Sequence, residues 1–258
     1  MLLNVLAVGD VVGSGGVRHL RARLPALKRQ HEVGLTIVNG ENSADGNGIT
    51  PESADALFAA GADVITTGNH VFRRREITDV LDSEPYLLRP FNYPPGTPGK
   101  GWCIYDLGRV QVCVANLMGT AYLESLDCPF RAADRILAET REAAVHIFDF
   151  HAEATGEKRA LGFYLDGRAS VLFGTHTHVQ TADACILPGG TGYLTDVGMT
   201  GAVHSVLGVK PELVIAKLKQ KRPVRFENAD GPMMLNAVLF SVDSVTGRTQ
   251  HVERLDIR

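Results

Sequence analysis

LLNVLAVGDVVGSGGVRHLRARLPALKRQHEVGLTIVNGE, residues 2–41, combines two short apolar runs with a helical pattern between them. Residues 2–10 and 35–41 are rich in Val, Ile and Leu, as buried strands are, whereas residues 17–30 repeat apolar side chains at helical spacing. A strand, a helix and a second strand in this order predict a βαβ unit with parallel strands. The segment therefore predicts an α/β fold built on a largely buried sheet.

The same alternation continues along the rest of the chain. Two apolar runs joined by Gly108 and Arg109 indicate a hairpin, so some antiparallel pairing is expected as well. Further strands are expected at 63–69, 144–150, 170–176, 233–243 and 251–257, and helices at 52–61 and 72–83. No repeat or linker interrupts the pattern. We expect a single domain over residues 1–258, with a second sheet facing the first and helices outside.

The composition excludes several classes of protein. The chain has 258 residues, 45% hydrophobic and 21% charged, and no run approaches the roughly 20 apolar residues of a membrane helix. Its net charge of −3 does not indicate a general nucleic-acid surface. The N-terminal run lacks the features of a signal peptide and is interpreted as a strand. Four cysteines without a C-x-x-C pair argue against a thiolate zinc site and a disulfide framework, so we expect a cytoplasmic protein without membrane contact.

Polar side chains follow five of the predicted strands, at the point where each apolar run stops. In open α/β sheets, sites form beyond the carboxyl ends of strands. Asp and Asn also cap helices and make turns, but five such strand ends in series are hard to assign to capping alone. The residues are Asp10; Asn39, Glu41, Asn42 and Asp45; Asn69 and His70; Asp149, His151 and Glu153; and His176 and His178.

Glu41 and the histidine pair are the strongest of these signals. Glu41 follows a buried strand directly, where an unpaired carboxylate is costly and a bound cation removes that cost. His176 and His178 are two apart, so in an extended chain both imidazoles project to the same side. A structural role is the ordinary reading of a lone strand histidine such as His151, but here it would share a surface with two others.

The types of candidate ligand atom indicate which metals could bind. Carboxylates, amide oxygens and three histidines without sulfur suit Mn, Fe, Zn, Co or Ni rather than Ca or Mg alone. There are too many donors for one tetrahedral ion. Two ions about 3.5–4 Å apart that share a carboxylate would use them all, and such pairs activate water against phosphate esters.

The ordered motifs GDVVG, NGEN, GNHVF, DFHAE and GTHTH, over residues 9–178, resemble those of the calcineurin-like metallophosphoesterases. Three departures point to a subgroup: Val12 replaces a histidine of the first motif, Glu41 stands at the bridging Asp position, and Thr175 replaces a glycine. Together with NGENSADGNGIT and DVGMTGAVHSVLG, they make the chain similar to the YmdB-like branch, which is associated with 2′,3′-cyclic nucleotide phosphodiesterase activity.

The resemblance implies a four-layer α/β/β/α sandwich of two mixed sheets flanked by helices. It also implies a metal-dependent phosphodiesterase with two ions, Fe or Mn first and Zn as a further choice. One ion would be held by Asp10, Glu41, Asn42 and His178, and the other by Glu41, Asn69, His151 and His176. The branch tends to form homo-oligomers, and we expect one here.

The mechanism that follows is attack on phosphorus by a hydroxide bridging the two ions, with His70 protonating the departing ester oxygen as general acid. The expected substrate is a small cyclic phosphodiester, with RNA ends as a second class. Alternatives are a metallophosphatase or nuclease acting on another ester, and a regulatory protein that binds metal or nucleotide without turnover.

Several interpretations stay open or fail at this stage. A dinucleotide-binding loop is not supported, because the required glycine would fall at Arg18, and no G-x-S-x-G motif indicates a serine hydrolase. The run of three arginines at 73–75 either steers an anion or forms a solvated helix face. Asp149 and Glu153 are alternatives as partners of a ligand imidazole, with Asp149 the less favoured, and His204 is unresolved.

Overall fold

Two mixed sheets form the centre of the computed structural model, which describes residues 1–258. The first sheet has the order β2-β11-β12-β1-β3-β4, with β13 paired to β12, and the second has the order β5-β6-β7-β8-β10-β9. The strands of the first are β1 (Leu2–Val8), β2 (Asp10–Val11), β3 (Val33–Asn39), β4 (Val64–Thr66), β11 (Met199–Ala202), β12 (Met233–Asp243) and β13 (Thr249–Ile257). Those of the second are β5 (Trp102–Asp106), β6 (Gln111–Met118), β7 (Val145–His151), β8 (Val171–Thr175), β9 (Cys185–Ile186) and β10 (Gly192–Leu194).

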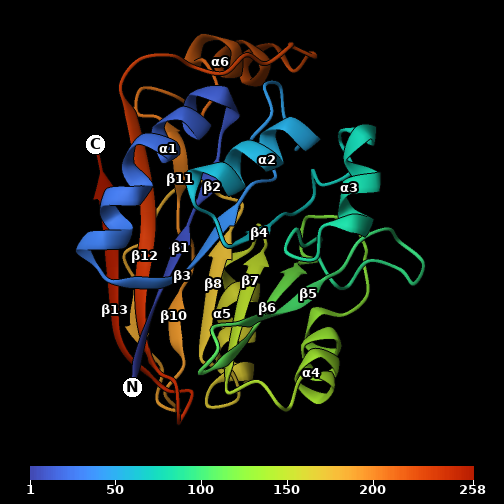
Figure 1. Ribbon diagram of the computed structural model, residues 1–258. Helices are drawn as coiled ribbons and strands as arrows, with labels where there is room; N and C mark the ends of the chain where they lie inside the picture. The colour runs from blue at the N-terminus through green and yellow to red at the C-terminus, as the bar shows by residue number, and fades with distance from the viewer.

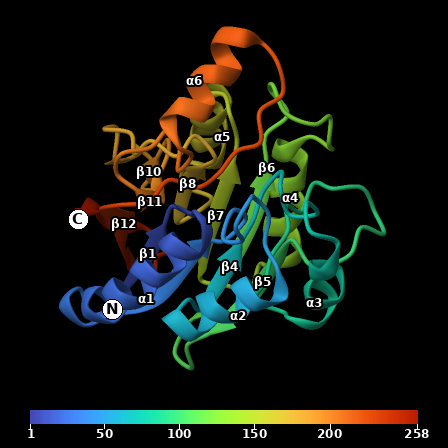
Figure 2. The same ribbon diagram turned by 90° about the horizontal axis from the view of Figure 1, so that it is seen from above.

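Helices cover the outer faces of both sheets (Figures 1 and 2). The helices of the chain are α1 (Gly13–Gln30), α2 (Pro51–Ala60), α3 (Thr78–Ser83), α4 (Pro129–Glu139), α5 (Thr155–Leu165) and α6 (Pro211–Gln220), with a 3-10 turn η1 (Arg75–Ile77) before α3. α1 and α2 cover the first sheet, and α4 and α5 cover the second. None of these helices is long and apolar enough to span a bilayer. The expected four-layer α/β/β/α sandwich is confirmed.

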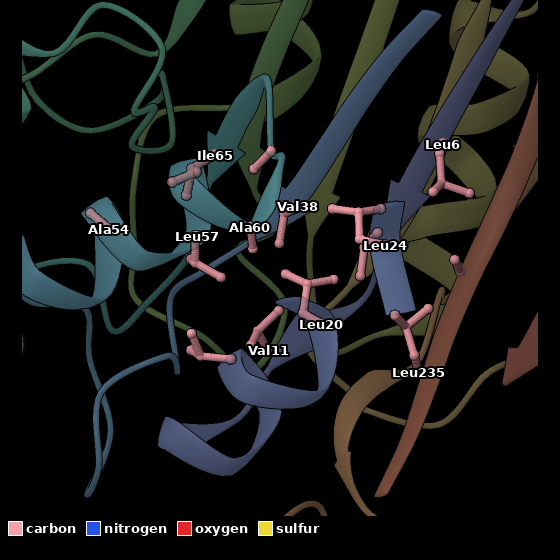
Figure 3. Close-up of a cluster of buried hydrophobic side chains, with 14 of the residues drawn as sticks. Leu6, Val11, Leu20, Leu24, Val38, Ala54, Leu57, Ala60, Ile65 and Leu235 are labelled. Carbon is pink, nitrogen blue, oxygen red and sulfur yellow. The ribbon is translucent and has the colours of Figure 1, made fainter. Parts of the chain in front are cut away.

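Alternation along each central strand explains the layers. In β1, Leu6 and Val8 pack in the cluster under α1 and α2, which Figure 3 shows, whereas Val5 and Ala7 pack in the cluster between the sheets. In β7, Ile147 belongs to the cluster between the sheets and its neighbour Phe148 to the one under α4 and α5. Strands buried on both faces favour apolar residues at successive positions, which is why Val5–Val8 and Ile147–Phe148 are apolar without alternation.

Parallel pairing brings the strand ends together. β1 pairs parallel with β3, and β3 with β4. In the other sheet β6, β7 and β8 are parallel neighbours. The carboxyl ends of these strands therefore lie at one end of the sandwich, where the polar residues of the sequence follow.

Two local expectations have different outcomes. The hairpin at Gly108 is confirmed, because β5 and β6 pair antiparallel across a turn in which Gly108 has φ of 75°. The helix expected over 72–83 is wrong in its first part. Arg73 and Arg74 precede η1, and the α-helix begins only at Thr78, so these two arginines do not form a helix face.

A fully buried ion pair supports the loop after β8. Lys158 Nζ on α5 lies 2.7 Å from Asp196 Oδ2, and neither side chain is exposed to solvent. The same Asp196 oxygen accepts a hydrogen bond from the backbone N–H of Thr177, and the other oxygen accepts one from Gly198. Asp196 thereby holds the loop that carries His176 and His178.

Loss of this lysine is expected to destabilise the fold strongly. Lys158→Met leaves the Asp196 carboxylate buried without its countercharge, so we expect the free energy of unfolding to fall by about 3–5 kcal/mol. Urea unfolding measures the loss. Lys210→Met removes the lysine of an exposed pair with Glu227 and serves as the control, with a much smaller change. Equal stability of the two variants would contradict this role of Lys158.

Candidate metal centre

Five strand ends place polar side chains in one buried cluster. Asp10 opens β2 directly after β1, Glu41 follows β3, and Asn69 follows β4. His151 is the last residue of β7, and His176 and His178 follow β8. These segments are far apart in the sequence, and every one of the expected ligand residues lies in the same cluster.

One half of the cluster is centred on His151. Its Nε2 lies 3.0 Å from Asn69 Oδ1, 3.0 Å from His176 Nδ1 and 3.3 Å from Glu41 Oε2. Ligand atoms of Glu41, His151 and His176 all lie within 4.8 Å of one another, a grouping able to hold a metal ion. Together with Asn69, these three residues are the set expected for the second ion.

The other half of the cluster contains Asp10, Asn42 and His178. His178 Nε2 lies 3.5 Å from Asp10 Oδ1 and 3.3 Å from Asn42 Nδ2. Asn42 Nδ2 also donates to Glu41 Oε1, 3.0 Å away. With Glu41, they are the set expected for the first ion.

Glu41 lies between the two halves. Its Oε1 faces Asn42 and its Oε2 faces His151, so each oxygen belongs to a different half. Gly68 leaves the space for this arrangement, because a Cβ at that position would lie 2.2 Å from His151 Cδ2 and 2.4 Å from Glu41 Oε2. A side chain at residue 68 would therefore displace both groups.

The electrostatics of the cluster call for a cation. Burial would raise the pKa of Glu41, but His151 and His70 hold it well below its ordinary value. Burial disfavours charge on His151, yet the Glu41 carboxylate outweighs it and raises the His151 pKa to about 9. Burial and the neighbouring His151 lower the pKa of His176 to about 4. Without a metal, a proton on His151 balances the negative charge of the buried Glu41 carboxylate. A bound metal ion can replace this proton as the countercharge.

The Asp10 carboxylate supports the same conclusion. Asp10 is fully buried, and its Oδ1 makes no hydrogen bond in the chain, with His178 Nε2 3.5 Å away. A buried carboxylate oxygen is costly without a countercharge, and a bound metal ion would supply that charge. Together with imidazole, carboxylate and amide donors, it fits a site for transition metals.

His70 lies beside the cluster but is partly exposed, with 28% of its side chain accessible. Its Nδ1 lies 2.9 Å from Asn42 Oδ1 and 3.2 Å from Glu41 Oε1, both acceptors, so the proton of the neutral ring resides on Nδ1. Its backbone N–H donates to Glu41 Oε2. No hydrogen bond within the chain engages Nε2.

The histidine pair is arranged differently from the expectation. His176 and His178 lie beyond β8 and have φ values of 102° and 63°, so they do not share a side by strand alternation. A turn in left-handed backbone conformation aims them instead. His176 Nδ1 faces His151, whereas His178 Nδ1 bonds the carbonyl of Leu207 and leaves its Nε2 toward Asp10.

Sequence reasoning missed a chain of hydrogen bonds behind His151. His151 Nδ1 lies 2.9 Å from Thr175 Oγ1, and that hydroxyl donates to Asp149 Oδ1 at 2.7 Å. Asp149 also accepts from Thr66 and Asn39. Burial raises the pKa of Asp149 to about 6. Asp149 was the less favoured partner of the ligand imidazole, but residues 149 and 151 are two apart on one strand, and that same-side relation was the available signal.

The remaining expected residues have other places. Val12 packs against the loop after β11, since a Cβ at Gly208 would lie 2.6 Å from its Cγ1. Asp45 accepts a hydrogen bond from Ser14 N at the start of α1 and is no part of the cluster. Glu153 Oε2 lies 3.0 Å from His176 Nε2. His204 is exposed and makes no hydrogen bond with the cluster.

Known proteins resemble this chain over nearly its whole length. A 2′,3′-cyclic-nucleotide 2′-phosphodiesterase of Bacillus subtilis is 47% identical over 254 residues, 98% of this chain and 96% of the relative. A putative phosphatase/phosphodiesterase of Mycoplasma genitalium is 33% identical over 99% of this chain and 93% of its own length.

Solved structures give the same picture. A novel phosphatase of Mycoplasma pneumoniae superposes with a TM-score of 0.94 at 33% identity, covering 100% of this chain and 94% of the other. A hypothetical protein of Thermus thermophilus superposes with a TM-score of 0.93 at 42% identity, covering 98% of each chain. The family described as YmdB-like protein matches residues 6–255. The chain therefore belongs to the YmdB-like protein family.

Proposed function

We propose that the chain is a metal-dependent phosphodiesterase that hydrolyses 2′,3′-cyclic nucleotides. The observation that carries the proposal is the buried Glu41 carboxylate, whose two oxygens face two separate groups of metal-type donors. The printed name of the Bacillus subtilis relative supports the substrate class. A phosphodiester needs charge neutralisation on its oxygens and an activated water, and a pair of ions suits both needs.

Two ions, Fe or Mn first and Zn as a further choice, would occupy the two halves of the cluster. Asp10, Glu41, Asn42 and His178 would hold one, and Glu41, Asn69, His151 and His176 the other. When bound, the ions would activate water and stabilise the charge that develops on the phosphoryl oxygens. The missing nitrogen donor at Val12 leaves the first set richer in oxygen than the second. Asn42 would supply an amide oxygen after its amide turns, because Nδ2 faces Glu41 and His178 in this structure.

His70 would supply the proton that the leaving oxygen needs. Hydrolysis forms a bond from the water oxygen to phosphorus and breaks one ester bond, and the ribose oxygen that leaves takes up one proton. The relative is named a 2′-phosphodiesterase, so we propose that the P–O2′ bond breaks and a 3′-phosphate remains. Asn42 Oδ1 and Glu41 Oε1 hold the ring through Nδ1, and Nε2 makes no hydrogen bond within the chain, so Nε2 is the atom that would donate the proton.

Thr175 is expected to hold the imidazole of His151 in its ligating orientation. Thr175→Val keeps the shape of the side chain but removes the hydroxyl between His151 and Asp149, so we expect metal affinity to fall by about 10–100-fold. Competition with a chelator measures the affinity. Thr175→Ser retains the hydroxyl and is the control, with affinity close to wild type. Equal affinities of the Val and Ser variants would contradict this role.

A comparison of substrates tests the proposed function. The purified protein, with Mn²⁺ or Fe²⁺ restored, is given 2′,3′-cyclic AMP, 3′,5′-cyclic AMP, 5′-AMP and bis-p-nitrophenyl phosphate, and the products are separated by chromatography. We expect preferential opening of the 2′,3′-cyclic ester to 3′-AMP. Preference for 5′-AMP would indicate a phosphatase instead. No turnover in a protein loaded with metal would favour a regulatory, non-catalytic role.

A further inference from the structure

A large cleft lies beside the candidate metal centre and is not used by the mechanism above. Its volume is about 940 Å³, toward the upper end of the range for small-molecule sites. The start of α1, the loop at 45–47, the turn at 73–74 and the segment 224–230 line it. Lys217 reaches it from α6, the helix at the top of Figure 1, which contributes no buried residue to the core.

The walls of this cleft continue the segments that carry the metal centre. Gly13, at the start of α1, donates its backbone N–H to the carbonyl of Asn42. Arg73 donates its backbone N–H to the carbonyl of His70, 2.9 Å away. The cleft therefore begins within three residues of His70, and Gly208 in its lining follows Leu207, whose carbonyl bonds His178 Nδ1.

The cleft presents free positive charge. Arg18, Arg73 and Arg225 line it, are exposed, and make no side-chain hydrogen bond or ion pair within the chain. The acidic residues of the walls are largely engaged. Asp45 accepts from Ser14 N and from the Asn228 amide, and Glu227 pairs with Lys210.

The cleft walls also contain a loop held by hydrogen bonds and an aromatic ring. Arg74 donates to the carbonyls of Asn47 and Asp45, which holds the 45–47 loop in place. Phe226 is half-buried in the cleft, with Lys217 Nζ 4.8 Å from its ring centroid. Guanidinium groups around an aromatic ring are the combination that binds phosphates and stacks bases of single-stranded nucleic acid.

The chemistry of the proposed substrate indicates which ligand the cleft binds. A 2′,3′-cyclic phosphate uses the 2′ and 3′ oxygens of one ribose and leaves its 5′ oxygen free to carry the rest of a strand. We propose that the cleft binds the phosphodiester backbone of an oligoribonucleotide whose 3′-terminal cyclic phosphate is opened at the metal centre. The proposal rests on the proposed function and names RNA 3′ ends, rather than mononucleotides alone, as the substrate class.

Binding of an RNA strand in the cleft is tested with two substrates and two double variants. The kcat and KM values are measured for 2′,3′-cyclic AMP and for a tetraribonucleotide with a 2′,3′-cyclic phosphate end. Arg73→Gln combined with Arg225→Gln removes two cleft charges. Arg21→Gln combined with Arg29→Gln removes two exposed charges from α1 outside the cleft and is the matched control.

The cleft variant is expected to raise the KM for the tetranucleotide at least about tenfold, since charged hydrogen bonds to phosphate are lost, while kcat/KM for the mononucleotide changes less than about twofold. The salt dependence of the tetranucleotide KM should also weaken. The control variant should match wild type. Equal effects of the cleft variant on both substrates, or none on either, would overturn the proposal alone. A wild-type protein that opens neither substrate would overturn the proposed function and this proposal with it.

Discussion

Glu41→Gln is expected to reduce turnover of 2′,3′-cyclic AMP at least about a thousandfold, equivalent to about 4 kcal/mol of lost transition-state stabilisation. Glu41 is the one residue placed between both donor groups, so its neutral amide weakens both ion sites at once. Bound metal, measured by mass spectrometry of the protein after dialysis, should fall with the activity.

Loss of folding is checked directly. Glutamine keeps the volume of Glu41 but removes the buried partner of His151, so the circular dichroism spectrum and unfolding temperature of the metal-free variant are compared with those of the metal-free wild type. Glu142→Gln changes an exposed carboxylate outside the cluster and should leave metal content and turnover unchanged. Full metal occupancy and activity in Glu41→Gln would contradict the proposed bridging role.

His70→Ala is expected to lower kcat for 2′,3′-cyclic AMP by about 10²–10⁴-fold while the metal content stays at the wild-type level. The His70 side chain touches Asn42 and Glu41 but is not itself in the group of ligand atoms around His151. His251→Ala removes an exposed histidine of β13 and is the control.

The leaving group makes this test specific for a proton donor. A p-nitrophenolate leaves without protonation, so His70→Ala should lower turnover of bis-p-nitrophenyl phosphate much less than that of the cyclic ester. An equal loss on both substrates would show that His70 acts through positioning or metal binding instead.

Much of this fold was predictable from the sequence because the strands are buried on both faces. Largely apolar runs at 2–8 and 145–150 mark such strands, and the polar residues that follow them lie at their carboxyl ends. The ordered motifs then assigned Glu41 and His151 to one cluster, and the structure brings them within 3.3 Å.

Other features depend on contacts that no local pattern contains. The left-handed backbone of His176 and His178 is held by a loop that Asp196 and Lys158 anchor from elsewhere in the chain. The link from His151 through Thr175 to Asp149 joins two strands through a threonine hydroxyl, and threonine is an ordinary strand residue. The late start of the expected 72–83 helix, at Thr78, follows from Arg74, which bonds the 45–47 loop.

The most direct test of the two-ion account is a titration of metal-free protein with Mn²⁺ or Fe²⁺, in which bound metal per chain and turnover of 2′,3′-cyclic AMP are measured on the same samples. We expect no turnover without metal and full turnover only as occupancy approaches two ions per chain. Full turnover by the chelated, metal-free protein, or saturation at a single ion with the second site never filled, would contradict it.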